Sequence, residues 1–354
     1  MIRRIPSGMA AVVLSGIGLG VALYWLIWHG PDWEEVFDAF TIVRWRWVVA
    51  AIALSVCSVT ARALSWHVVI TQAMPKPHPR LTQTFSAFSV GLLANSVLPG
   101  RIGELARVGV LARHLPSGRG IWATLSGTVF AHRLFDVFPS AILLLYVFQT
   151  ARIPHWAVTS LLLFVGIGMA LFTFAVAGAK RHHRATLSDA DRQLHRLVTM
   201  ARTGLGVLHA PVPAVGAALL QILGWGFQLG EVYVAMRAFG IDESLPAAAL
   251  VLALMNVATV FPLWPGNVGL VQAAVALPLG SYGVAKARGF AYGIGLQAID
   301  VGVGVGLGLL ALGREGVSFA MLRRMPEPTE EADDAEREFE EAVPETRARA
   351  RVPG

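Results

Sequence analysis

Long apolar runs recur along the chain between residues 9 and 312, with short polar segments separating them. A run of about 20 apolar residues is long enough to cross the hydrocarbon core of a bilayer as a helix. Six runs reach this length, at residues 9–28, 48–70, 121–147, 156–177, 212–239 and 290–312. The pattern predicts an all-α polytopic membrane protein with about six full transmembrane helices.

Two further apolar segments are each interrupted by a Pro-Gly pair. Residues 81–98 lead to Pro99-Gly100 and a charged stretch, and residues 247–261 lead towards Pro265-Gly266 and a return over 267–279. At 1.5 Å per residue each arm is roughly 20 to 25 Å long, which is short of the roughly 30 Å hydrocarbon core. We therefore expect two re-entrant hairpins, although a simple hydropathy count gives eight spans.

The charged loops orient the predicted spans. Segment 180–209 holds six Lys or Arg and two Asp, a bias typical of cytoplasmic loops. Segment 29–46 contains four acids and resembles an amphipathic helix at the outer interface. With Arg3 and Arg4 before the first span, these features predict an inner-membrane protein whose termini are both cytoplasmic. The first hairpin would open inward and the second outward.

Composition supports membrane insertion and excludes several classes of function. Of 354 residues, 55% are hydrophobic and 15% charged, which makes a soluble enzyme domain improbable. The net charge of +6 conceals a tail, 314–354, with seven Arg against eleven acids, leaving 22 Lys or Arg against 12 acids elsewhere. A basic body favours anionic lipid headgroups over nucleic acid. The tail is too polar to fold alone, so we expect a disordered cytoplasmic segment.

The candidate chemistry is equally restricted. The single cysteine, Cys57, excludes an intrachain disulfide and a multi-cysteine metal site. The sequence has no phosphate loop, zinc signature or nucleophile elbow, so we expect no catalytic residue, metal or cofactor. Glu231 is a lone acid near the predicted outer end of its span, and we favour a rim position over proton coupling. Gly302, Gly304, Gly306 and Gly308 suggest one small-residue packing face.

The two hairpin tips suggest an internal repeat. Residues 98–104 read LPGRIGE and residues 264–270 read WPGNVGL, a separation of 166 positions. About thirty residues after each tip a span carries polar groups three apart, Arg133 and Asp136, then Gln297 and Asp300. Hairpins entering from opposite faces would make 47–178 and 212–313 inverted repeats, the architecture of many secondary transporters. Chance Pro-Gly breaks in Gly-rich membrane helices remain the alternative.

Several motifs together resemble the membrane flippase domain of the lysylphosphatidylglycerol synthase family. They are Asn95-x-x-x-Pro99-Gly100-Arg101-x-Gly103-Glu104-x-x-Arg107, His132-Arg133-x-x-Asp136, Pro265-Gly266-x-x-Gly269 and the Arg62 end of the second span. The resemblance covers roughly residues 9–313 and implies a transmembrane domain over 1–313. Full-length members append a soluble aminoacyl transferase domain, so the resemblance implies a stand-alone flippase-like member without that activity.

The chain departs from the family at one pair of positions. The family has a Glu after the second tip and an Arg in the last span, where this chain has Gln272 and Gln297. Losing one partner of a buried ion pair costs several kcal/mol, whereas exchanging both for amides preserves a neutral hydrogen bond. We therefore expect Gln272 to contact Gln297 and, by the repeat, Glu104 to pair with Arg133.

The charged first hairpin is the candidate site for an anionic headgroup. In a helix Arg101, Glu104 and Arg107 share one side, and a helix that starts at the Pro-Gly break directs its free N–H groups towards the midplane. The planar guanidinium groups of Arg101, Arg107 and Arg133 can each donate two hydrogen bonds to a phosphate. The alternative is that the charges only lock the fold. The predicted headgroup-binding residues are Arg101, Arg107, Arg133, Asn95, Gly100 and Gly103, supported by Glu104, Asp136 and Arg62, with second-half counterparts Pro265, Gly266, Gly269, Gln272, Gln297 and Asp300.

Two functions compete at this point. The first is translocation of an anionic phospholipid or a polyprenyl-phosphate-linked headgroup between leaflets by alternating access. The second is a non-transporting membrane subunit that recruits or regulates a lipid-modifying or glycosyl-transferring partner through its basic loop and acidic tail. An intramembrane enzyme lacks any recognisable catalytic set. A homo-oligomer and a lipid-modifying enzyme partner both remain open, and no nucleic acid is expected.

Overall fold

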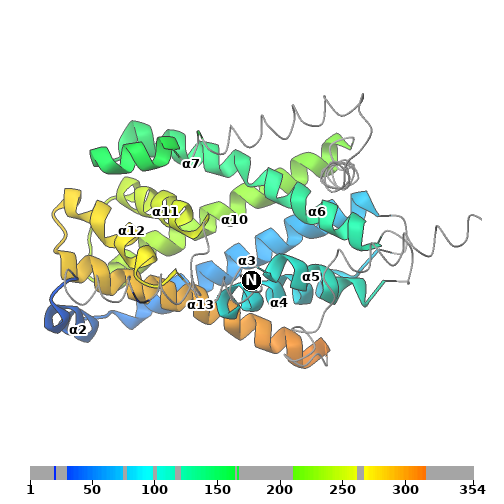
Figure 1. The fold of residues 1–354 in the computed structure, drawn as a ribbon, viewed down its shortest axis with the longest axis horizontal. Coiled ribbons are helices and arrows are strands. Elements are labelled where there is room, and N and C mark those ends of the chain that lie inside the picture. The colour runs from blue at the N-terminus through cyan, green and yellow to red at the C-terminus, as the bar shows by residue number, and fades with distance from the viewer. Residues whose placement is uncertain are drawn as a thin grey trace, which may run out of the picture.

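The computed structural model describes residues 20, 30–74, 78–98, 102–115, 121–163, 166, 210–260 and 267–315. Within these ranges the regular elements are all helices (Figure 1). The first predicted span, most of the fourth, the basic loop and the tail lie outside the described residues, so the total number of spans stays a prediction.

Four long apolar helical segments form the body of the molecule. They are α3 (Trp45–Ala73), the consecutive helices α6 (Ile121–Phe135) and α7 (Val137–Thr150), α10 (Pro211–Ala238) and α13 (Lys286–Glu315). The 29 residues of α3 extend for about 43 Å, more than the hydrocarbon core requires. These segments coincide with four of the predicted spans. The chain is a multi-pass membrane protein.

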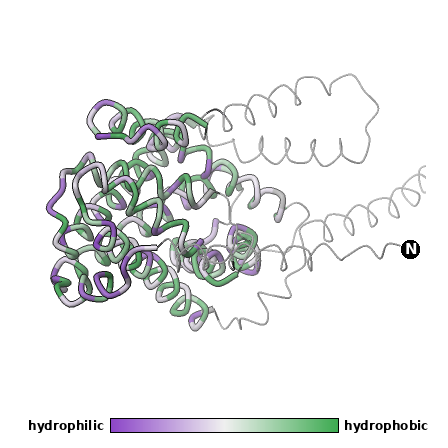
Figure 2. The backbone as a smooth tube through the Cα atoms, turned by 60° about the vertical axis from the view of Figure 1, so that its left-hand side comes forward, coloured by the Kyte–Doolittle hydropathy of each residue, from purple (hydrophilic) through white to green (hydrophobic). Residues whose placement is uncertain are grey.

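Apolar side chains cover the outside of the long helices, as lipid contact requires. On α10 the exposed residues Val212, Val215, Leu219 and Leu223 recur at helical spacing and form one stripe. Figure 2 shows hydrophobic positions along the helices and hydrophilic ones mainly at their ends and in the connecting turns. In water such a stripe would be an interaction or aggregation surface, whereas in a bilayer it faces acyl chains.

The span predicted over 121–147 is two helices rather than one. The chain turns at Asp136. Its N–H donates at 3.1 Å to the carbonyl of Arg133, three residues back, whereas a continuous α-helix would use the carbonyl four residues back. The Ser140 hydroxyl in turn donates to the Asp136 carbonyl at 2.5 Å. The turn places a carboxylate in the middle of an otherwise apolar segment, where it is available to neighbouring helices.

Helices α3 and α10 are antiparallel neighbours at the centre of the molecule (Figure 1). The Ser58 hydroxyl donates to the Gly224 carbonyl at 2.8 Å, and the Ser65 hydroxyl donates to the Ala217 carbonyl at 2.9 Å. Small residues allow this close approach, because a Cβ on Gly224 would lie 2.9 Å from Cγ of Arg62. Hydroxyl-to-carbonyl bonds between apolar helices then fix their register.

Two helical hairpins pack against this body. The first consists of α4 (Leu81–Val97) and α5 (Gly103–Ala112), and the second of α11 (Leu245–Val260) and α12 (Leu270–Leu279), which ends in the short 3-10 helix η5 (Gly280–Tyr282). The 17 residues of α4 extend for about 25 Å, short of a full span. Asn95 Oδ1 accepts the Gly103 N–H at 2.9 Å, and Asn267 Nδ2 donates to the Ala258 carbonyl at 3.0 Å. An asparagine thus joins the two arms of each hairpin near its tip.

Helix α13 contacts both hairpins. A Cβ at Gly293 would meet α12, whereas a Cβ at Gly304 or Gly308 would meet α4. Gly302 and Gly306 face open space. The predicted four-glycine face is therefore wrong as stated: only alternate members pack, because residues two apart point to different sides of a helix.

The amphipathic helix expected before the second span is α2 (Trp33–Thr41). Asp32 caps it by accepting the Glu34 N–H at 2.9 Å. Val36 and Ala39 are buried against the bundle, while the acids of the first turn face outward. Helix α2 lies beside the first half of α13, at the end of the molecule where the second hairpin opens (Figure 1).

Candidate functional site

Polar side chains from several helices form a connected line through the apolar interior, which we call the polar ladder. Its members are, in order, Glu104 on α5, Arg133 on α6, Asp136 at the α6–α7 turn, Trp225 on α10, Arg62 on α3 and Gln228 on α10. Each contacts the next through a hydrogen bond or a ring contact. The ladder therefore joins the first hairpin to the central α3–α10 pair.

The ladder begins with an ion pair between the first hairpin and α6. Arg133 Nε donates to Glu104 Oε1 at 2.7 Å, and Nη2 of the same guanidinium contacts the same oxygen. Arg133 Nη1 also donates to Asp136 Oδ2 at 3.3 Å. The predicted pairing of Glu104 with Arg133 is confirmed. The Arg133 side chain is still 45% exposed.

Asp136 connects α6 and α7 to α10. Its Oδ1 accepts the indole N–H of Trp225 at 2.8 Å and an amide N–H of Gln221. With Arg133 on the other oxygen, the carboxylate is held by charged and neutral donors together. The sequence marked Asp136 as a supporting residue, and the structure adds Trp225 and Gln221. The sequence signal for Trp225 and Gln221 was a polar group on an otherwise apolar span. Nothing in the sequence indicated that Asp136 is their partner.

Arg62 joins Trp225 and Gln228 at the α3–α10 end of the ladder. Its Nη2 donates to Gln228 Oε1 at 2.6 Å, and its guanidinium carbon lies 5.4 Å from the centroid of the Trp225 ring. Its Nε has no hydrogen-bond partner among the described residues. His132, which is 2% exposed, contacts the Arg62 carbonyl at 3.1 Å and so fixes α6 against α3. Sequence reasoning assigned His132 no role.

Arg107 takes a different position from the one expected. Its side chain is 4% exposed, and its guanidinium carbon lies 4.7 Å from the Trp66 ring centroid and 5.6 Å from that of Phe88. Nε and Nη2 have no hydrogen-bond partner in the described part of the chain. The structure therefore does not bring Arg107 into the hydrogen-bonded group around Glu104. Arg107 is a stacked, buried cation with two unused donors.

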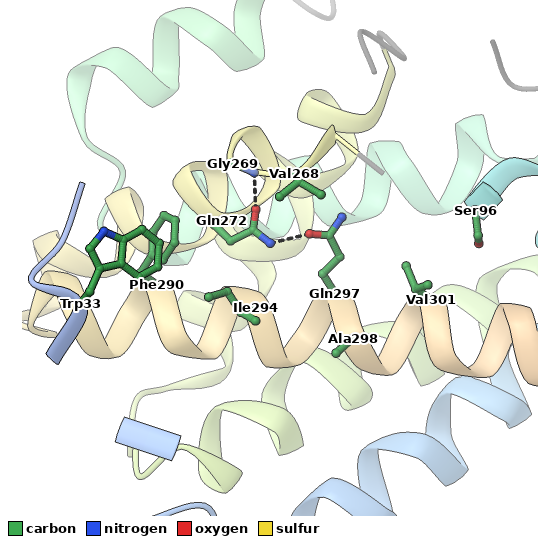
Figure 3. Close-up of a pocket in the computed structure, with 10 residues that line it drawn as sticks. All are labelled: Trp33, Ser96, Val268, Gly269, Gln272, Phe290, Ile294, Gln297, Ala298 and Val301. Atoms are coloured by element: carbon green, nitrogen blue, oxygen red, sulfur yellow. Dashed lines mark hydrogen bonds between the residues drawn. The ribbon is translucent and has the colours of Figure 1, made fainter. Parts of the chain in front are cut away.

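The corresponding contact in the second half is neutral. Gln272 Nε2 donates to Gln297 Oε1, which confirms the predicted amide pair (Figure 3). Gln272 Oε1 also accepts the Gly269 N–H at 2.6 Å. Gly269 has φ of +89°, a conformation that side-chain-bearing residues avoid, so glycine is required at this start of α12.

A cavity of about 480 Å³ adjoins the amide pair. Figure 3 shows Gln272 and Gln297 meeting at its centre, with Trp33 of α2 at one end and Ser96 of α4 at the other. Val268 lines it from the tip of the second hairpin. The ends of both hairpins therefore reach one mainly apolar cavity, of a size typical of small-molecule pockets.

Comparison with known sequences assigns the chain to a family. The family described as the lysylphosphatidylglycerol synthase TM region matches residues 9–308. The chain belongs to this family. A similar protein is the UPF0104 membrane protein of Methanothermobacter thermautotrophicus, 23% identical over 274 residues, which cover 71% of this chain and 77% of that protein. No solved structure matches the chain.

Family membership confirms the resemblance seen in the motifs, and the matched region is the family's transmembrane part, not a catalytic domain. Five of the motif positions, Pro99, Gly100, Arg101, Pro265 and Gly266, lie outside the described residues. Arg62, Glu104, Arg133 and Asp136 lie together in the polar ladder. Among the described residues no group of three or more His, Cys, Asp or Glu is placed to hold a metal ion.

Two second-half acids depart from the expected positions. Asp300 was expected to match Asp136 beside Gln297, but its carboxyl faces Glu231 on α10. The rim interpretation of Glu231 is wrong, because this residue is 1% exposed and lies between α10 and α13. Hydropathy places a residue along a helix but does not decide which face meets a neighbouring helix.

Proposed function

We propose that this protein moves an anionic lipid, either a phospholipid or a polyprenyl-phosphate-linked headgroup, between the leaflets of the inner membrane. The two hairpins are re-entrant in this proposal, both termini are cytoplasmic, and the halves rock against each other for alternating access. The first hairpin opens to the cytoplasm and the second to the outside. Helix α13, which contacts both hairpins, is the element on which they would move.

The observation that carries the proposal is the meeting of both hairpin ends at one cavity. Ser96 comes from the end of α4 and Val268 from the segment before α12, yet both line the same space. Hairpins that open to opposite faces and end at a common site are the arrangement alternating access requires. A protein that only recruits a partner has no need for such a cavity.

Contacts between repeat-related residues support the inverted repeat. Ser58 contacts Gly224 and Arg62 contacts Gln228, and each pair is separated by 166 positions, the same separation as the two Pro-Gly breaks. In a two-fold arrangement, a residue that contacts its own equivalent lies near the axis. The axis of the proposed repeat would therefore pass between α3 and α10.

The charge of the first half supports an anionic headgroup. Arg107 and Arg62 have guanidinium donors without partners among the described residues, and the Arg133 side chain is 45% exposed. A buried donor without an acceptor costs about 1 to 3 kcal/mol, and more when it is charged. A phosphate can accept from such forks bidentately. The second half, with an amide pair instead, would contact the uncharged part of the lipid.

The test is transport by the purified protein in liposomes. We expect labelled phosphatidylglycerol to exchange between leaflets faster than labelled phosphatidylcholine, and Arg133→Ala to reduce exchange to that of protein-free liposomes. Arg288→Ala is the matched control, because it removes an exposed arginine from the first turn of α13. Arg133→Lys keeps the positive charge but removes the planar guanidinium that can donate two hydrogen bonds to one phosphate. We expect lipid exchange by this variant to be slower than by the wild type.

Two outcomes would contradict the proposal. One is exchange no faster than in empty liposomes for every anionic lipid, with a protein that is folded by circular dichroism. The other is equal loss in the Arg133 and Arg288 variants. If in addition activity in cells required residues 314–354 and a co-purifying enzyme, the chain would act as a membrane subunit instead.

A further inference from the structure

Two carboxyl groups face each other in the interior, outside the polar ladder. Glu231 on α10 and Asp300 on α13 lie opposite one another, and the Ser55 hydroxyl on α3 faces the same carboxyl of Glu231. Glu231 is 1% exposed, and its Oε1 has no hydrogen-bond partner among the described residues. An ionised carboxylate in this position would leave a charged oxygen unsatisfied in an apolar core, which is costly.

The nearby cations do not neutralise both acids. Arg133 is taken by Glu104 and Asp136, and Arg107 is stacked on two aromatic rings. The positive charge of Arg62 attracts the carboxyl groups of Glu231 and Asp300. It attracts the carboxylate of Asp136 as well. Arg62 is therefore shared among three carboxyl groups, those of Glu231, Asp300 and Asp136. One proton on the first two would reduce the excess negative charge.

We propose that Glu231 and Asp300 form a proton-binding pair that holds one proton when α10 and α13 are packed as in this structure. Two carboxyl groups side by side in a low-dielectric site do not both ionise readily, and a shared proton converts their repulsion into a hydrogen bond. A protonated carboxyl group can donate a hydrogen bond, which neither ionised carboxylate can do.

The surroundings favour a proton over a metal cation. The site offers two carboxyl groups and one hydroxyl, whereas Ca²⁺ takes six to eight oxygen ligands and Mg²⁺ takes an octahedral set. The other ionisable groups facing the pair are Arg62 from α3 and Tyr292 from α13, whose hydroxyl donates to the Val232 carbonyl at 2.8 Å. Helices α4, α11 and α12, which also pack against α10 or α13, have no titratable side chain.

The position of the pair connects it to the cavity. Asp300 lies on α13 between Gln297 and Val301, which both line the cavity, while its own carboxyl faces Glu231. Removing the proton would place two anions at the contact between α10 and α13 and weaken that contact. Because α13 also contacts both hairpins, we expect proton loss to change how they pack around the cavity. The proton-binding step itself does not depend on lipid transport.

The test is infrared difference spectroscopy of the purified protein in lipid nanodiscs, titrated from acid to alkaline pH. We expect a carbonyl band of a protonated carboxyl group that persists near neutral pH. The band should shift in D₂O. It should shift in Glu231→Gln and in Asp300→Asn, which each leave one buried carboxyl group beside Arg62, and disappear in the double variant Glu231→Gln/Asp300→Asn.

Matched controls are available on α2, where Glu35 and Asp38 are exposed. Glu35→Gln and Asp38→Asn make the same chemical changes and should leave the band unchanged. Glu231→Asp keeps both carboxyl groups and should move the band without removing it, which guards against a loss caused by misfolding. Labelled-lipid exchange is not needed for any of these measurements, so failure of the transport proposal would leave their result intact.

Three results would overturn the inference. The first is a wild-type protein with no protonated carboxyl band near neutral pH, which would mean that both groups are ionised. The second is a band that survives in the double variant Glu231→Gln/Asp300→Asn, since it would then belong to another residue. The third is a band that disappears when NaCl replaces KCl, which would make the pair a sodium site.

Discussion

Replacing Gln272 by Glu and Gln297 by Arg would put an ion pair where this chain has two amides. The two amides are in direct contact, with Gln272 only 4% exposed, so each single substitution would introduce a buried charge without a counter-ion. A charge near the middle of a transmembrane helix costs about 2.5 to 3.5 kcal/mol. The double substitution would pair the charges and recover most of that cost.

The hydrogen bonds make the two single variants unequal. Glu at position 272 can still accept the Gly269 N–H, and the Gln297 amide can rotate to donate to the carboxylate. Arg at position 297 would instead face the Gln272 amide N–H, and rotating that amide would remove the acceptor from Gly269. We therefore expect Gln297→Arg to destabilise the protein more than Gln272→Glu does.

The measurement is a double-mutant cycle on unfolding by SDS in mixed micelles. Opposite charges about 4 Å apart, at an effective dielectric constant of about 20, attract by about 4 kcal/mol, so a coupling energy of about 3 kcal/mol is expected after desolvation. Gln149→Glu, an exposed amide on α7, is the single-charge control. A coupling energy below about 0.5 kcal/mol, the error of additivity, would refute the contact between positions 272 and 297.

Three further predictions concern packing and the polar ladder. Gly308→Ala should destabilise the protein by about 1 to 3 kcal/mol, because the added Cβ would lie 2.4 Å from Leu93 Cβ. Gly306→Ala should stabilise it by about 0.5 to 1 kcal/mol, because this glycine faces open space within a helix, and thermal unfolding compares the two variants. Arg107→Met should leave stability unchanged or raise it, because it removes a buried cation with unused donors, and it should weaken binding of labelled phosphatidylglycerol. A marked loss of stability would show instead that stacking of Arg107 on aromatic rings is needed for folding. Asp136→Asn should lower the unfolding free energy by about 1.5 to 3 kcal/mol, because Arg133 and Trp225 lose a charged acceptor while Arg133 keeps Glu104, and an unchanged SDS midpoint would contradict this.

Much of the fold follows directly from the sequence. The apolar runs locate α3, α10 and α13 to within a few residues, because a helix that satisfies its own backbone hydrogen bonds is the form in which such a run crosses lipid. The Pro-Gly breaks locate the two hairpins for a related reason, since proline removes a backbone donor and glycine tolerates a tight turn. The paired loss of charge at Gln272 and Gln297 even indicates a contact across 25 positions, which the structure contains.

Only the tertiary structure decided which polar groups meet. Arg107 and Glu104 lie three positions apart on α5, yet one stacks on Trp66 and the other binds Arg133, because neighbouring helices cover different parts of the α5 surface. Glu231 was assigned to the rim from its place along α10, and it lies instead against Asp300. The local sequence determines where a helix begins and ends and which of its residues are apolar. The partner of a buried charge depends instead on how two packed helices are rotated relative to each other, and all the contacts between them fix that rotation.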